Sequence, residues 1–228
     1  MPAPASQTVP KTERRTISAE LSGARIERRQ DDDAPDRLAG YGAVYYDGTP
    51  ETEYELWTNC VERIMPGAFD RAVREDDVRG LFNHDRNLIL GRVKAGTMRI
   101  KTDKRGLWYE IDVPDTQPGR DTATSVERGD VTGSSFSFYV KEVTWRDEGD
   151  LEIREINDVE LFDTGPVTFP AYEGTTSAAR GEPAFAEVRA ELAAWRDNLG
   201  DIAAAERAGI AARARARRLR LIEIEAAG

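Results

Sequence analysis

Apolar residues between residues 14 and 172 come in short runs that are broken by glycine, proline or acidic turn residues. In the range 140–145, side chains alternate between two sets, Val140, Glu142 and Thr144 against Lys141, Val143 and Trp145. The pattern has no 3.6-residue period, which is typical of a β-strand. The same reasoning predicts strands at 38–46, 56–64, 78–82, 88–93, 97–101, 107–113, 134–145, 152–161 and 167–169. This part of the chain is therefore predicted to be mainly β.

Two helices are predicted to interrupt the strands. Pro66 and Gly67 open the first, which runs to about Asp76 with Phe69 and Val73 on one face. The second spans about 119–128. Many short strands with a few inserted helices favour an α+β domain, which we expect to be a closed or nearly closed antiparallel β-barrel flanked by helices.

The pattern changes after Tyr172. Residues 173–183 have the Gly, Thr, Ser and Ala content of a linker. Beyond it, apolar residues recur at spacings of three and four, which predicts a helix: Phe185, Val188, Leu192, Trp195, Leu199 and Ile202. This seam is short for an independent coiled coil, so we expect the helix to pack on a partner helix or on the β domain.

The predicted organisation has three parts: a Pro- and Ala-rich tail at 1–13, a β domain at 14–180, and a linker with a helical extension at 181–228. The extension ends in a basic stretch without acids, formed by Arg207, Arg213, Arg215, Arg217, Arg218 and Arg220. We expect it to be solvated or to contact an acidic partner.

The composition excludes several kinds of metal site and covalent cross-link. The 228-residue chain has a net charge of −10, one cysteine and one histidine. These counts exclude an internal disulfide, Cys/His zinc sites and histidine-metal clusters on one chain. Cys60 is expected to be a packed thiol, and Asp31–Asp33 lack the spacing of a calcium loop.

The net charge and the lengths of the apolar runs also indicate which partners the protein binds and in which cellular compartment it is found. The acidic excess argues against general nucleic-acid binding. No stretch approaches the roughly 18 apolar residues of a membrane span, and no signal peptide is visible. We expect a protein of the reducing cytosol that does not bind membranes.

Two candidate catalytic residues stand next to predicted strands. His84 follows the apolar run Gly80–Phe82, where a sheet presents functional groups to a groove. A surface histidine beside Asp85 is the simpler alternative. Asp163 is placed just after a strand, where an aspartate that forms a turn before Thr-Gly-Pro is equally consistent.

A third candidate is the serine pair Ser134 and Ser135, which follows a glycine-rich turn at the start of a long strand. A nucleophilic serine needs an exposed hydroxyl on a rigid element, beside backbone N–H groups that can hold an oxyanion. A strand that merely begins with Gly and Ser is the alternative.

Together these residues and the sequence around them resemble the prohead (capsid maturation) proteases of tailed phages, which are serine peptidases similar in fold to herpesvirus assemblin. The resemblance covers about 14–180 in the family's order and spacing. Its motifs are Arg15–Leu21, Leu38–Tyr46, Glu62–Phe69, Leu81–Asp85, Leu90–Arg92, Gly106-Leu107, Arg128–Asp130, Gly133–Phe138 and Val167–Tyr172.

The resemblance implies roles for two of the candidates. The histidine of the family's Asn-His-Asp motif falls on His84, and the serine of its Gly-Met-Ser-Phe-Gly-Phe motif falls on Ser135. Ser134 stands where the family has Met, and Ser137 stands where it has a second Gly. Ser135 is thereby implied as the nucleophile and His84 as its general base.

A third role and two further positions follow from the same resemblance. The acid before the family's final strand, often Glu, falls on Asp163, which would orient the imidazole. Gly165 stands where Ser is common. Arg92 is a weaker candidate for anion support, and we favour a solvated charge there. No cofactor or metal is implied.

The activity implied by the resemblance is a serine endopeptidase that cleaves the scaffolding portion of a major capsid protein precursor, and itself, inside the immature procapsid in the host cytoplasm. Self-association is implied as a regulator. The alternative left open is a non-catalytic procapsid assembly factor that retains the same fold. The helical extension would bind scaffold-like helices or cover the domain's own core.

Overall fold

The computed structural model describes residues 12–29, 34–170, 185–202, 205 and 209. The chain divides into two compact units, Met1–Ala179 and Arg180–Gly228. In the second unit, residues 186–202 are helical. The predicted linker at 173–183, the six C-terminal arginines and Asp31–Asp33 lie outside the described residues.

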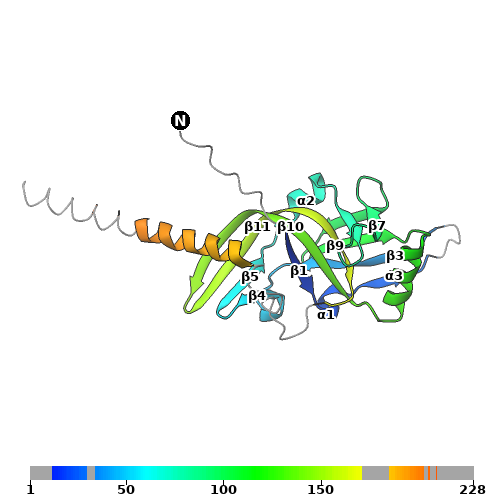
Figure 1. Ribbon diagram of the computed structural model, residues 1–228, viewed down its shortest axis with the longest axis horizontal. Helices are drawn as coiled ribbons and strands as arrows, with labels where there is room; N and C mark the ends of the chain where they lie inside the picture. The colour runs from blue at the N-terminus through cyan, green and yellow to red at the C-terminus, as the bar shows by residue number, and fades with distance from the viewer. Residues whose placement is uncertain (1–11, 30–33, 171–184, 203–204, 206–208, 210–228) are drawn as a thin grey trace, which may run out of the picture. The chain divides into compact units, whose positions relative to one another are not determined.

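The strands of the described residues all lie in the first unit, in agreement with the predicted mainly β pattern (Figure 1). The strands are β1 Glu13–Ile17, β2 Arg25–Glu27, β3 Arg37–Val44, β4 Glu53–Trp57, β5 Cys60–Ile64, β6 Arg79–Leu81, β7 Ile89–Arg92, β8 Met98–Thr102, β9 Gly106–Asp112, β10 Gly133–Glu148 and β11 Leu151–Val167. The helices are α1 Ala19–Ser22, the 3-10 turn Pro50–Thr52, α2 Asp70–Glu75 and α3 Gln117–Glu127.

Sheet A is built on the two longest strands, β10 and β11, which form an antiparallel hairpin. Its order is β1-β10-β11-β5-β4, and β6 and β7 extend from β11. The first half of β11 pairs with β5 and its second half with β6, both in parallel. Around Ser135 the sheet therefore runs β1, β10, β11, β6, β7, and these neighbours carry the site.

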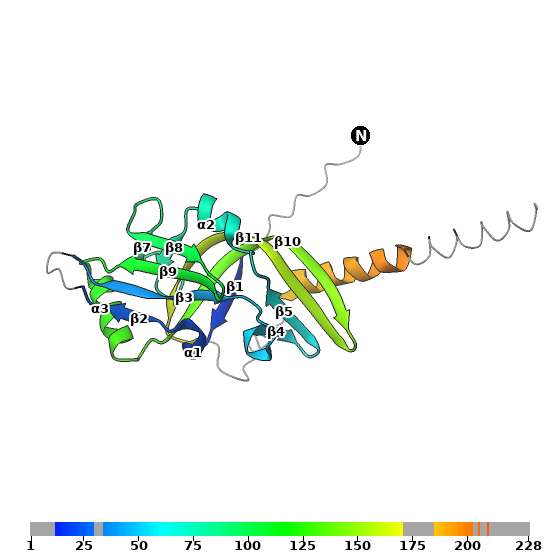
Figure 2. The same ribbon diagram turned by 180° about the vertical axis from the view of Figure 1, so that it is seen from behind.

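Sheet B has the order β2-β3-β9-β8 and is antiparallel throughout. In the described residues both sheets have open edges, and β11 makes parallel pairs in sheet A. The expected closed antiparallel barrel is thus corrected to two open sheets. The hydrophobic pattern could not distinguish them, because both place alternate side chains on an inner face. Figure 2 shows sheet B from the opposite side.

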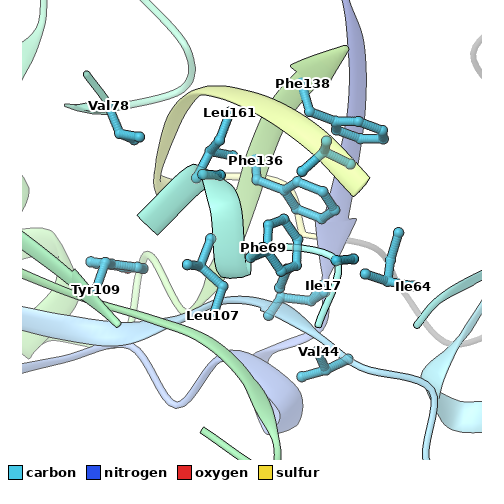
Figure 3. Packing of buried hydrophobic residues seen from close by; sticks show 14 of the residues in the cluster. Ile17, Val44, Ile64, Phe69, Val78, Leu107, Tyr109, Phe136, Phe138 and Leu161 are labelled. Carbon is cyan, nitrogen blue, oxygen red and sulfur yellow. The ribbon is translucent and has the colours of Figure 1, made fainter. Parts of the chain in front are cut away.

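The core lies between the two sheets and includes the start of α2 (Figure 3). Phe69, just before α2, packs edge-on against Phe136 of β10 with ring centroids 5.5 Å apart. Phe136 in turn stacks on Phe138 at 5.0 Å. Leu107 and Tyr109 bring sheet B into the same cluster. This packing fixes one face of β10 and leaves the other face to carry polar groups.

Strand β1 is held to sheet A by a buried ion network. Glu62 of β5 is fully buried and accepts from Arg15 Nε at 2.6 Å and from Arg154 Nη1 at 2.7 Å. Glu13 contacts both arginines. Burial alone would lower the pKa of Arg15, but Glu62 and Glu13 outweigh it and raise that pKa. The network fixes the backbone of β1 beside Ser135.

Cys60, at the start of β5, is buried, which agrees with the expected packed thiol. Among the helices of the described residues, none is long and apolar enough to cross a membrane.

Candidate active site

Strand alternation separates the two candidate serines. Along β10, Ser134, Phe136 and Phe138 lie on one face, which packs in the core. Ser135 and Ser137 lie on the opposite face. Ser134 is therefore directed into the protein, whereas Ser135 is on the face where β6 and β11 bring the other site residues.

The contacts of Ser134 agree with this assignment. Its hydroxyl is fully buried, 2.7 Å from Ser22 Oγ and 3.0 Å from the Tyr109 hydroxyl. Burial raises the pKa of Tyr109 to about 12, so the phenol remains a neutral hydrogen-bonding partner. Ser134 thus belongs to a small hydroxyl network that joins β10, α1 and sheet B.

Asp163 lies within β11, so the expectation of a position after the strand, or in a turn, is wrong. It is placed by a β-bulge: Ser137 pairs with Asp163, but the next residue, Phe138, pairs with Leu161. Leu161 is in the core, and an unbroken strand would place Asp163, two residues on, on the same face. The extra residue, Phe162, turns Asp163 to the face of Ser135.

His84 stands in the loop between β6 and β7. Its φ is 57° and that of Asn83 is 53°, so both residues are left-handed. Asn tolerates this conformation better than most residues, because its short polar side chain can bond locally. Here the Asn83 amide donates to Thr168 Oγ1 at 2.8 Å and its carbonyl accepts from Thr168 N at 2.9 Å. These bonds tie the histidine loop to the end of β11.

The three predicted residues meet in one hydrogen-bonded series. His84 Nε2 is 2.6 Å from Ser135 Oγ, and His84 Nδ1 contacts Asp163 Oδ1. All three are buried: Ser135 is 2% exposed, so the expected exposed hydroxyl is not observed, and the side chains of His84 and Asp163 are 9% and 12% exposed. When Nδ1–H donates to the carboxylate, Nε2 is left as an acceptor for the serine hydroxyl.

Ser135 has a second neighbour that the sequence did not indicate. Its hydroxyl is also within donating distance of the Arg15 backbone carbonyl, at 2.8 Å. One hydroxyl hydrogen can serve only one strong acceptor at a time. Transfer to His84 therefore requires the hydrogen to point at Nε2 rather than at Arg15.

Two residues of β11 fit closely against the site. Gly165 pairs with Ser135, and a Cβ at Gly165 would lie 2.3 Å from the Leu81 carbonyl oxygen. A serine, common at this position in the resembled family, would not fit here without a shift of β6. Thr164 donates to the Ser135 carbonyl at 3.0 Å, which fixes the backbone of the nucleophile.

The remaining candidates lie outside this series. Arg92 forms an ion pair with Asp77, with Nε 2.9 Å from Oδ2, and is nearly half exposed. The Arg92 guanidinium lowers the pKa of Asp77 to about 2. Arg92 is thus a surface charge with a partner, as we favoured. Within the described residues, no three or more His, Cys, Asp or Glu side chains group as metal ligands.

Ser137, Thr164 and Thr168 contact the site residues, but their sequence positions predicted no role for them. For Ser137 a signal was present, because it stands two residues after Ser135 and so shares its face of the strand. The contacts of Thr164 and Thr168 depend on which strands pair, and no local pattern reports that.

Asn83 offers a test of how the histidine loop is held. We expect Asn83→Ala to lower the activity up to about 100-fold. The histidine loop loses its two hydrogen bonds to Thr168, and alanine is strained at the positive φ of this position. Small misplacements of a catalytic group are costly. Asn83→Gly relieves the strain but not the lost bonds, so it should lie between wild type and alanine. Cleavage rates and thermal unfolding of both variants measure this; equal activity of all three proteins would contradict it.

Known proteins are similar to this chain over the region that carries the candidate site. The family described as caudovirus prohead serine protease matches residues 24–187, which include His84, Ser135 and Asp163. A solved structure that is similar is that of the bacteriophage T4 capsid assembly protease, at 11% identity and a TM-score of 0.44 over 72% of this chain and 100% of that one. No curated protein sequence matches. Because the family match spans well over half of the chain, the protein belongs to the caudovirus prohead serine protease family.

Proposed function

We propose that the chain is a serine endopeptidase of phage head maturation, with Ser135 as nucleophile, His84 as general base and Asp163 as the acid that orients the imidazole. The observation that carries this proposal is the continuous series from Ser135 Oγ through both imidazole nitrogens to the Asp163 carboxylate. Nucleophile, base and orienting group within hydrogen-bond reach are the signature of an activated serine.

The proposed reaction follows from this geometry. Ser135 Oγ attacks the scissile carbonyl carbon while its proton moves to His84 Nε2. The tetrahedral intermediate collapses, the C–N bond breaks, and the leaving amine takes the proton from Nε2. Water then attacks the acyl-enzyme and gives a proton to Nε2, and this proton returns to Ser135 as the C–O bond breaks. Throughout, Asp163 stabilises the imidazolium.

The proposed substrate is the scaffolding portion of the major capsid protein precursor, together with the protease chain itself, inside the procapsid formed in the host cytoplasm. Membership of a prohead protease family supports this substrate class. The net charge of −10 over the full chain makes nucleic acid an unsuitable partner. Self-association is part of the proposal, because it would restrict cleavage to crowded assemblies. The three proposed parts of the chain remain 1–13, 14–180 and 181–228.

The experiment is co-expression of the full chain with the capsid precursor, followed by mass spectrometry of the precursor, and treatment of the purified chain with diisopropyl fluorophosphate. We expect defined precursor fragments and one phosphorylated residue, Ser135. An intact precursor together with an unlabelled, folded chain that still enters procapsids would contradict the protease proposal and support the non-catalytic assembly factor.

A further inference from the structure

Ser137 donates a hydrogen bond from its hydroxyl to Asp163 Oδ2, the carboxylate oxygen that His84 does not use. From this contact we infer that Ser137 is a positioning residue, which holds the carboxylate in the orientation that His84 requires. The inference rests on the proposed serine protease function and adds a fourth member to the series.

The backbone places Ser137 for this role. It is two residues after Ser135 on β10, so both hydroxyls lie on one face, and its register partner on β11 is Asp163. The bulge at Phe162 brings Asp163 to that same face. The side chains of Ser137 and Asp163 are thus opposite neighbours across one strand pair, with no other residue between them.

The hydrogen bond between Ser137 and Asp163 is buried, which strengthens its hold on the carboxylate. Ser137 is 1% exposed and Asp163 is also buried, so water does not replace either partner easily. Among the residues that the structure describes, each carboxylate oxygen has one side-chain hydrogen-bond partner: His84 Nδ1 at Oδ1 and Ser137 at Oδ2. The terminal torsion of an aspartate is broad and roughly two-fold, so side-chain packing alone does not set it. The hydrogen bond from Ser137 fixes that torsion.

A merely structural serine would behave differently. If Ser137 only satisfied a buried oxygen, its removal would lower stability and leave the orientation of the imidazole unchanged. If it positions Asp163, its removal lowers kcat with little change in KM, because substrate contacts remain. It also disturbs the Nδ1–H bond of His84, which can be observed directly because His84 is the single histidine of the chain.

The first experiment compares Ser137→Ala with Ser134→Ala in the full chain. Both remove one buried hydroxyl from β10, but Ser134 contacts Ser22 and Tyr109 and does not touch Asp163. We expect Ser137→Ala to lower kcat by about 10- to 100-fold, in the range that small misplacements of catalytic groups cost. Ser134→Ala should lose stability without this loss of kcat.

The readouts are cleavage of a capsid-precursor peptide, thermal unfolding, and the low-field proton NMR signal of His84 Nδ1–H. We expect this signal to be sharp in wild type and Ser134→Ala and to shift or broaden in Ser137→Ala. An unchanged signal in folded Ser137→Ala overturns the inference. Because the signal does not need turnover, this holds even if wild type cleaves nothing, which would overturn the proposed function instead.

A second experiment covers the case in which Ser137→Ala does not fold. Asp163→Glu carries the carboxylate one methylene farther, toward its partners His84 and Ser137, whereas Ser137→Gly makes room on the Ser137 side. We expect each single variant to perturb the His84 signal and to lose activity, and the combined variant to recover at least ten-fold over Asp163→Glu. If the two substitutions act independently, their effects multiply and the inference is wrong.

Discussion

Replacing Ser135 by alanine is expected to lower kcat for peptide-bond cleavage by about 10⁶-fold, the scale of loss when a triad serine is removed. The substitution removes the atom that we propose forms the acyl-enzyme, and His84 then has no hydroxyl proton to accept from a partner at 2.6 Å. The fold should survive, because Ser135 lies on the face of β10 that is turned away from the core cluster. Precursor processing measured by mass spectrometry, with circular dichroism as the check on folding, tests this.

Ser134→Ala is the matched control for Ser135→Ala, since the two serines are adjacent on one strand and both are buried. Ser134 bonds to Ser22 and Tyr109, and its loss should cost about 1–3 kcal/mol of stability by leaving partners unsatisfied. Cleavage should persist in this variant. If Ser134→Ala abolished processing while Ser135→Ala retained it, the assignment of the nucleophile would be reversed.

Most strands could be predicted from the sequence because their signal is local. β7, β8 and β9 lie within a residue or so of their predicted bounds, because turn residues delimit each apolar run. The predicted strand 56–64 is instead the hairpin of β4 and β5, which turns at Asn59 with a φ of 62°. Apolar residues stand on both sides of the short polar turn at Thr58 and Asn59, so the sequence pattern reads as one continuous strand.

The error at β11 has a different origin. Residues 152–161 and 167–169 were predicted as separate strands, because Asp163, Gly165 and Pro166 are typical of turns. In the structure β11 continues through them to Val167, since β10 supplies partners on one side and β6 on the other. Pairing partners that are far apart in sequence override local turn propensity, and no local pattern encodes them.

The candidate site was more predictable than the architecture. His84 and Ser135 were assigned by motif, and alternation along β10 explains why Ser135 rather than its neighbour faces His84. The bulge that turns Asp163 toward His84 was not predictable, because it depends on the register between two strands. The prediction of a closed barrel was wrong for the same reason. Closure depends on pairing between edge strands that are distant in sequence, and the alternation of polar and apolar residues does not report that pairing.

His84→Ala is expected to lower kcat about as much as Ser135→Ala, by about 10⁶-fold, because serine and histidine of a triad act as one unit. His84 connects the other two residues, with Nε2 at Ser135 and Nδ1 at Asp163. The combined Ser135→Ala, His84→Ala variant should therefore be no less active than either single variant. Multiplied losses in the combined variant would show that the two residues act separately.

The single histidine makes this prediction unusually direct to check. Diethyl pyrocarbonate should inactivate the wild-type chain in step with one modified imidazole, because His84 is the only histidine that can react. Ser134→Ala should be inactivated in the same way, since Ser134 makes no contact with the imidazole. Full cleavage by a chain whose His84 is modified or replaced would exclude His84 as the base, and no second histidine could take its place. The general base would then have to be a carboxylate or an amine, and the series from Ser135 to Asp163 would be structural.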